Sequence, residues 1–186
     1  MLVPDEQDEL SVMLARNTAA ARDDDNLYLV VQPTAWCQLG CGYCGQEHSS
    51  IHLSVEDQAR FVLRVRDKLA KKPYKTMELS WFGGEPLSGL KVMRDMSPGL
   101  MKAAADFGAL YTSRVVTNGL ALTDSVATEL WRDMGVGHVE VTLDGVASFH
   151  DKRRYTKGGL PTFDPIFDNV VRLARRDDIG PAAQPL

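Results

Sequence analysis

The chain has 186 residues, of which 44% are hydrophobic and 25% are charged, a composition typical of one globular domain. Its formal net charge of −4, from 25 acidic and 21 basic side chains, argues against nucleic-acid binding, which requires a basic surface. No apolar run approaches the roughly 20 residues that span a bilayer, and the acidic amino terminus differs from a secretory signal, so we expect a cytoplasmic protein without membrane partners.

The first predicted element is a short helical arm. Leu10, Met13 and Leu14 recur at helical spacing, and the acidic run RDDDN then predicts a solvated linker or a partly disordered arm. From Leu27 the run LYLVVQP is apolar and β-branched, which is typical of a buried strand. This strand leads directly into a loop, residues 34–48, that holds every cysteine of the chain.

Three further strands alternate with helices in the rest of the chain. Ser54 is the expected N-cap of a helix, and the strand MELSW follows and ends in FGGEP. The next helical stretch is expected to break at SPG, residues 97–99, before the third strand, LYTSRVV, which closes with TNG. Thr123 is the expected N-cap of another helix. The fourth strand lies in HVEVTLDG, and Asp164 and Pro165 are expected to cap the last helix.

This alternation of strand, loop and helix predicts an α/β fold with a parallel sheet and right-handed crossovers. In such sheets the chemistry lies beyond the carboxyl ends of the strands. The cysteine loop, GGEP, TNG and TLDG each follow one strand, so we expect these four loops to meet at one pocket. Four strands do not close a barrel, and we therefore expect either a partner chain that covers the open sheet edge or a longer version of the protein.

Three cysteines lie within eight residues, Cys37, Cys41 and Cys44. Clustered thiols in a cytosolic chain indicate metal or redox chemistry rather than disulfides. One interpretation is a zinc site with His48 as the fourth ligand. The other is an iron–sulfur cube in which three thiolates hold three irons and the fourth iron is left for a small molecule. The iron interpretation is favoured because the loop follows a buried strand, because the other strand-end loops carry polar motifs, and because three glycines allow the backbone to approach a bulky cluster: Gly40, Gly42 and Gly45.

The chain resembles the radical S-adenosylmethionine (radical SAM) enzymes. The C-x3-C-x2-C spacing, with Tyr43 before the last cysteine, matches the cluster motif of that superfamily, and GGEP at residues 83–86 matches its second motif. TLDG followed by HDKRR, residues 142–154, is similar to the peptide- and protein-modifying branch, which includes SPASM-type and sulfatase-maturating enzymes. The resemblance implies a partial (β/α) barrel of the radical SAM type, with about four of six β/α units present. It implies an amino-terminal arm or linker at 1–26, an incomplete radical SAM core at 27–178 and a tail at 179–186.

The resemblance also implies a reaction. In the family, the open iron of a [4Fe-4S] cluster chelates the amino and carboxylate groups of S-adenosyl-L-methionine (SAM). One electron from the reduced cluster cleaves SAM, and the resulting deoxyadenosyl radical abstracts hydrogen from a substrate. The expected partners are a peptide or protein substrate and a reduced electron donor of the flavodoxin or ferredoxin type.

Carried over residue by residue, the resemblance places the three cysteines on the cluster and the GGEP loop on the cofactor. The two glycines expose backbone carbonyls, and Glu85 supplies a carboxylate to the ammonium group. Arg154 is expected to serve the cofactor carboxylate or to order the site, whereas His150 and Asp151 are expected to orient their loop. The candidate cofactor-binding residues are Tyr43, Gly83, Gly84, Glu85, Pro86, Thr117, Asn118, Thr142, Asp144 and Arg154.

The chain departs from the family in two respects. No cysteine follows Cys44, so the auxiliary clusters of many peptide-modifying members have no ligands here, and the last two barrel units are expected to be missing. Two functions therefore compete: a peptide-modifying oxidoreductase, and a truncated, catalytically weak remnant that acts as a binding or accessory module. A zinc-binding domain that uses Cys37, Cys41, Cys44 and His48 is a third.

Overall fold

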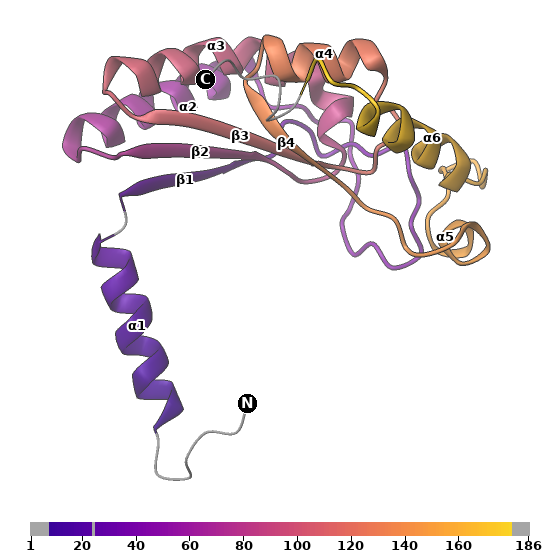
Figure 1. Ribbon diagram of the computed structural model, residues 1–186, viewed down its shortest axis with the longest axis horizontal. Coiled ribbons are helices and arrows are strands. Elements are labelled where there is room, and N and C mark those ends of the chain that lie inside the picture. The colour runs from indigo at the N-terminus through magenta and orange to yellow at the C-terminus, as the bar shows by residue number, and fades with distance from the viewer. Residues whose placement is uncertain (1–7, 24, 180–186) are drawn as a thin grey trace.

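A parallel sheet of four strands is the centre of the fold (Figure 1). The computed structural model describes residues 8–23 and 25–179. Neighbouring strands pair in parallel and in chain order, which confirms the predicted α/β class and its four strands. The strands are β1 (Asn26–Val31), β2 (Thr76–Trp81), β3 (Leu110–Thr117) and β4 (Val136–Val141).

The three crossover helices all cover the same face of the sheet (Figure 1). Strand order 1-2-3-4 with helices on one side is the arrangement of a barrel, since a doubly wound sheet places helices on both faces. Two further helices lie beyond the carboxyl ends of the strands, and a single 3-10 turn, η1 (Pro86–Gly89), precedes α3. The helices of the sheet region are α2 (Val55–Lys71), α3 (Leu90–Asp106) and α4 (Asp124–Arg132), and those beyond it are α5 (Ala147–Arg153) and α6 (Phe163–Ala174).

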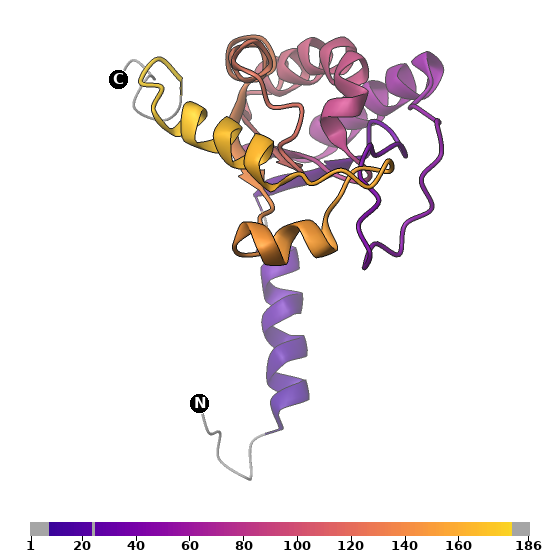
Figure 2. The ribbon, with the colours of Figure 1, turned by 90° about the vertical axis from the view of Figure 1, so that its right-hand side faces the viewer.

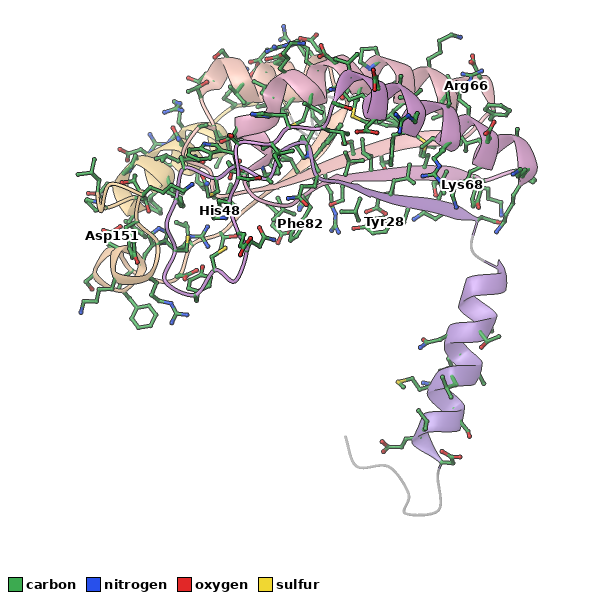
Figure 3. All side chains as sticks on the ribbon, turned by 180° about the vertical axis from the view of Figure 1, so that it is seen from behind. Tyr28, His48, Arg66, Lys68, Phe82 and Asp151 are labelled. Carbon is green, nitrogen blue, oxygen red and sulfur yellow. The ribbon has the colours of Figure 1, made fainter. Side chains whose placement is uncertain are left out.

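The hydrophobic core lies between the sheet and these helices. Met77, Leu79 and Trp81 of β2 are fully buried and belong to the core cluster. Because successive side chains of a strand point to opposite faces, the alternate residues of each strand face the open side of the sheet. Tyr28 and Phe82 lie on that open side, away from the helices, and both are substantially exposed (Figure 3). The open side is therefore the concave face of the partial barrel.

Helix α3 continues through Pro98, so the predicted break at SPG is wrong. Proline removes one backbone hydrogen bond, and an isolated helix would kink or end there. The carbonyl that loses its donor to Pro98 is that of Arg94, and the hydroxyl of Ser97 donates to the neighbouring carbonyl of Met93 at 2.8 Å. A Cβ at Gly99 would lie 3.3 Å from Val62 of α2, so glycine allows the two helices to pack closely. Tertiary packing thus outweighs the local preference for a break.

Two predicted helix starts are confirmed by their hydrogen bonds. The side chain of Ser54 accepts from the backbone N–H of Asp57 at the start of α2. The side chain of Thr123 accepts from the backbone N–H of Val126 at the start of α4. Both are N-caps that fill an otherwise unpaired donor of the first turn.

The start of the last helix differs from the prediction. Asp164 and Pro165 lie inside the first turn of α6 and do not cap it. The backbone N–H groups of Thr162 and Phe163 instead donate to the carboxylate of Asp151, each at 2.8 Å. Helix α5, which contains this aspartate, was not predicted, because its seven residues are too few to show an apolar period.

Helix α1 (Glu9–Asp23) extends away from the sheet (Figures 1 and 2). The apolar positions Leu10, Met13 and Leu14 are exposed on it, as expected for an arm. Residues 180–186 of the predicted tail lie outside the described residues. Within the described ranges, no helix is both long and apolar enough to cross a membrane.

Candidate functional site

A cavity of about 320 Å³ lies at the carboxyl ends of the strands. Every strand contributes to it through the segment that follows, so the four loops meet as predicted. Two candidate residues, Pro86 and Asp144, do not line the cavity. Pro86 is buried in η1, and Asp144 contacts Arg154, which does line the cavity. The candidate residues that line the cavity are Cys37, Cys41, Tyr43, Cys44, Gly83, Gly84, Glu85, Thr117, Asn118, Thr142 and Arg154.

The three cysteines are free thiols whose exposure increases along the loop. Cys37 is 6% exposed, Cys41 is half-buried and Cys44 is exposed. The sulfur of Cys37 accepts from the backbone N–H of Leu39 at 3.4 Å and from the side-chain amide of Asn118 at 3.7 Å. Burial raises the pKa of the Cys37 and Cys41 thiols. Burial thus favours the protonated form of these two thiols.

The cysteine loop is held by the segment after α5, residues 153–157. The N–H of Gly40 donates to the carbonyl of Tyr155 at 2.8 Å, and the N–H of Gly42 donates to the carbonyl of Arg153 at 2.9 Å. Figure 2 shows the two segments side by side. A Cβ at Gly40 would lie 3.5 Å from the Tyr155 ring. Gly40 and Gly42 thus bring the loop against this segment, which is a different close approach from the one predicted for them.

The GGEP loop packs directly on the cysteine loop. The N–H of Glu85 donates to the carbonyl of Trp36 at 2.8 Å. A Cβ at Gly84 would lie only 2.6 Å from that same carbonyl oxygen, so no side chain fits there. Gly83 has φ +107°, a backbone conformation that strongly favours glycine. The contact between the loops therefore requires glycine at position 84, whereas the backbone conformation favours glycine at position 83.

Glu85 connects the GGEP loop to the TNG loop. Its carboxylate is 1% exposed and accepts from the hydroxyl of Thr117 at 2.6 Å, from the N–H of Asn118 at 2.7 Å and from the N–H of Leu87 at 2.9 Å. Burial raises the pKa of Glu85, and these donors oppose the rise. An ionised carboxylate has about four acceptor positions, so protein donors fill most of them. The geometry assigns Glu85 a role that sequence reasoning missed, as the link between two loops.

A chain of side-chain amides reaches Cys37. The hydroxyl of Ser88 donates to Gln38, the amide of Gln38 donates to Asn118 at 3.2 Å, and the amide of Asn118 donates to the sulfur of Cys37. Asn118 was predicted to contact the cofactor. That contact stays a prediction, and the hydrogen bond to the sulfur of Cys37 places Asn118 beside a candidate metal ligand.

Arg154 brings positive charge to the cavity wall. Its guanidinium group donates to the hydroxyl of Tyr43 at 2.5 Å and lies 3.9 Å from the carboxylate of Asp144. Its Nε is buried, and no described residue accepts a hydrogen bond from it. A buried cation with an unpartnered N–H is suited to an anionic group. Arg154 therefore fits a carboxylate ligand.

His150 holds the backbone around Arg154, as predicted. The hydroxyl of Thr162 donates to the carbonyl of Arg154 at 2.7 Å, so His150 Nε2 donates to that hydroxyl oxygen, 3.1 Å away. His150 Nδ1 then accepts from the N–H of Asp144 at 3.2 Å. The ring is therefore neutral, and burial lowers the pKa of His150 further. His150 is a positioning residue.

The cysteine loop carries the possible ligands of both metal interpretations. Among the described residues, no three Cys, His, Asp or Glu side chains converge closely enough to hold one metal ion. His48 Nε2 lies 3.7 Å from the sulfur of Cys44, a separation that two ligands of one zinc ion could also have. In an iron–sulfur cube each thiolate binds a different iron, so the three sulfurs need not converge on one point. All three cysteines line the cavity, an arrangement that the cube interpretation requires.

Sequence reasoning missed several apolar residues of the cavity. Leu39, fully buried between two cysteines, anchors the loop, and its neighbour across an isolated bridge is Thr156. Phe82 and Val116 enter the cavity from the open face of the sheet. The alternation of side chains along a strand could have predicted that both face the open side, because Phe82 lies two residues after Ser80 and Val116 lies two residues after Arg114.

Comparison with known proteins gives one family and several relatives. The Radical SAM superfamily matches residues 31–177. An uncharacterized protein of Synechocystis sp. is 29% identical over 161 residues, which cover 80% of this chain and 38% of that protein. A serine-type anaerobic sulfatase-maturating enzyme of Klebsiella aerogenes is 28% identical over 140 residues, covering 74% of this chain and 34% of the enzyme.

A solved structure gives the same fold. The structure described as native anSMEcpe with bound AdoMet and Kp18Cys peptide has a TM-score of 0.68 and 22% identity, covering 81% of this chain and 41% of that one. The chain thus spans 34–41% of the length of these three proteins. The family match covers most of the chain, the fold agrees, and the chain therefore belongs to the radical SAM superfamily.

Proposed function

We propose that residues 27–178 bind a [4Fe-4S] cluster and SAM, and that the chain uses them to abstract hydrogen from a residue of a peptide or protein. One observation supports this proposal: a single cavity is lined by three thiols, by the two glycines of the GGEP loop and by a buried arginine. These three features come from different β/α units, and an ordinary strand-end turn requires none of them. A reducing, cytoplasmic location is part of the proposal, since it keeps the thiols free.

In this proposal Cys37, Cys41 and Cys44 hold the cluster. When bound, the cluster supplies an open iron for the amino acid part of SAM and the electron that cleaves SAM to a deoxyadenosyl radical and methionine. Arg154, which lines the cavity, binds the carboxylate of SAM through its guanidinium group. Gly83 and Gly84 present backbone without side-chain obstruction, so the cofactor approaches the GGEP loop closely.

The proposed substrate is a peptide that enters from the open face of the sheet. Phe82 lines the cavity and is 48% exposed, so it provides an apolar contact at the entrance. The similar sulfatase-maturating enzymes and the peptide-bound anSMEcpe structure support this class of substrate. The electron donor in the proposal is a reduced protein of the flavodoxin or ferredoxin type.

A second function is kept because of one observation, the length of the match. The chain spans 34–41% of the compared proteins. An accessory module would bind a cluster at its cysteines, or a partner chain along its open sheet edge, and would not cleave SAM. Formation of deoxyadenosine separates this alternative from the enzyme.

The experiment uses the whole chain, purified without oxygen and reconstituted with iron and sulfide. We expect about four irons and four sulfides per chain and an electron paramagnetic resonance signal of a reduced cube that changes when SAM is added. Dithionite and SAM should then yield deoxyadenosine. The variant in which all three cysteines are alanine is the control, and it should bind neither iron nor sulfide. One zinc per chain and no iron would refute the proposal, whereas a normal cluster without deoxyadenosine would support the accessory module.

A further inference from the structure

We propose that Lys152, Arg153 and Lys157, here called the basic patch, form the docking surface for an acidic electron-donor protein. This inference rests on the proposed function, because it concerns how the cluster receives its electron. It identifies a place on the molecule and a chemical character of the partner. An acidic flavin or iron–sulfur protein is complementary to such a surface in charge.

The basic patch concentrates positive charge on a protein whose net charge is negative. The chain carries a net charge of −4, yet the six residues KRRYTK, 152–157, contain four basic side chains and no acidic one. Lys152 and Lys157 are exposed and form no ion pair within the part of the chain that the structure describes. Arg153 is 48% exposed and lies 3.4 Å from Asp144, which balances part of its charge. The carboxylate of Asp151 is turned to the start of α6 and accepts two backbone hydrogen bonds there.

Two cations of the basic patch lie over aromatic rings that directly precede cysteines. Lys157 Nζ is 3.5 Å from the ring centre of Trp36, the residue before Cys37. The guanidinium of Arg153 is 5.1 Å from the ring centre of Tyr43, the residue before Cys44. Such contacts fix the position of a cation without removing its charge. A protein docked on the patch therefore lies close to the cluster ligands.

The backbone strengthens this connection. The N–H of Lys157 donates to the carbonyl of Gln38 at 3.0 Å, in the middle of the cysteine loop. The N–H groups of Gly40 and Gly42 donate to carbonyls of the patch segment, as described above. Because electron transfer slows steeply with distance, a surface joined to the ligand loop by backbone hydrogen bonds suits a donor. The side-chain view in Figure 3 places His48, the end of the cysteine loop, and Asp151 at the same end of the molecule.

The basic patch lies outside the cavity. Arg154 lines the cavity, whereas its neighbours Lys152, Arg153 and Lys157 do not. A partner on the patch would therefore leave the cavity and its entrance at Phe82 free for SAM and the substrate. This separation favours an electron donor over an acidic substrate peptide, which must reach into the cavity. In the step itself the donor loses one electron, the cluster gains that electron, and no atom is transferred.

The test compares two charge-reversed variants of the reconstituted holoprotein. One carries Lys152→Glu and Lys157→Glu. The control carries Arg64→Glu and Lys68→Glu, the same change in net charge, on exposed positions of α2. Figure 3 places Lys68 at the end of the molecule away from His48. The probe is a bacterial flavodoxin of strongly negative net charge, with its dissociation constant and its rate of oxidation by the holoprotein measured at low and high salt.

We expect the patch variant to bind the flavodoxin about ten-fold more weakly and to oxidise it about ten-fold more slowly at low ionic strength. Above about 0.5 M salt the difference should shrink to less than about two-fold, because salt screens the attraction. The control should behave as wild type. Equal effects in both variants, or none in either, would overturn the inference, and so would a patch variant that binds flavodoxin normally but binds the substrate peptide poorly. Deoxyadenosine formation with dithionite tests the proposed function separately, because dithionite needs no docking surface.

Discussion

The buried carboxylate of Glu85 gives the sharpest test of how the loops are held together. Replacing it by glutamine keeps the volume and leaves one oxygen and one NH2 group in place of two acceptor oxygens. The hydroxyl of Thr117 already accepts from the N–H of Gly119 at 3.1 Å, so its own proton is directed to Glu85. With its oxygen toward Thr117 and Leu87, the glutamine NH2 faces the N–H of Asn118, and two donors then oppose each other.

The expected cost follows from these contacts. A buried donor left without a partner costs roughly 1–3 kcal/mol, and a lost hydrogen bond to a charged group costs a similar amount. Removal of the buried charge offsets part of this, so we expect Glu85→Gln to lower the free energy of unfolding by about 2 kcal/mol. Urea unfolding of the apoprotein under reducing conditions measures it, as a midpoint about 1 M lower for a slope of about 2 kcal/mol/M.

A double-mutant cycle with Thr117→Val tests the link itself. The two side chains share a 2.6 Å hydrogen bond, so the destabilisations should differ from additivity by about 1 kcal/mol. Additivity within about 0.3 kcal/mol, or a Glu85→Gln variant as stable as wild type, would refute the assigned role. Thr128→Val, whose hydroxyl donates to the carbonyl of Asp124 in an exposed hydrogen bond of α4, is the matched control and should add independently.

Three further predictions concern the same region. Burial lowers the pKa of His150, so the stability that its neutral form contributes is present above pH 6.5 and is lost as the pH falls below that value, by at most about 1.4 kcal/mol per pH unit. His150→Gln should remove this pH dependence from the free energy of unfolding, measured in urea at pH 7.5 and 5.5. Gly84→Ala should displace the GGEP loop from Trp36, since the new Cβ would lie 2.6 Å from the carbonyl oxygen of Trp36. After reconstitution this variant should bind substantially less iron than wild type, whereas Gly45→Ala, where a Cβ has open space, should bind the wild-type amount. Asn118→Ala should remove one hydrogen bond to the sulfur of Cys37 and make the cluster harder to reduce, seen as a lower midpoint potential in a redox titration, and an unchanged potential would contradict the 3.7 Å contact.

The sequence predicted the sheet because each strand is a short apolar run followed by a distinctive loop. The positions of the loops then followed from parallel pairing, since all carboxyl ends meet at one edge. Local signals also predicted the N-caps Ser54 and Thr123, whose hydrogen bonds span only three residues. These features depend on nearby residues or on the period of the strands, and both are visible in a single sequence.

What the sequence did not predict depends on contacts between distant segments. Nothing local to Pro98 indicates that packing against α2 keeps its helix continuous. The partner of the Asp151 carboxylate is the start of α6, eleven residues away, and the partner of Gly40 is Tyr155. The motif predicts a cofactor contact for Glu85, which stays a prediction, and the hydrogen bonds of this residue show a further role, the joining of two loops. Motifs identify where chemistry occurs, and only three-dimensional contacts tell which atoms remain available for it.

These contacts also show which parts of the candidate site are held in place by the protein itself. The cysteine, GGEP and TNG loops are joined by hydrogen bonds among their own atoms, through Trp36, Glu85 and Asn118, and the segment after α5 holds the cysteine loop from the other side. The sulfur of Cys37 thus accepts two hydrogen bonds, whereas the sulfur of Cys44, exposed near the end of the loop, has only His48 as a hydrogen-bond partner among the residues that the structure describes. Residues that are already held in place lose little conformational entropy when a ligand binds. In the proposed function, most of the entropy lost on cluster assembly would therefore come from ordering the Cys44 end of the loop. Arg153, which lies 5.1 Å from the ring centre of Tyr43, holds the residue before Cys44, so a residue of the proposed docking surface also restrains this end of the cysteine loop.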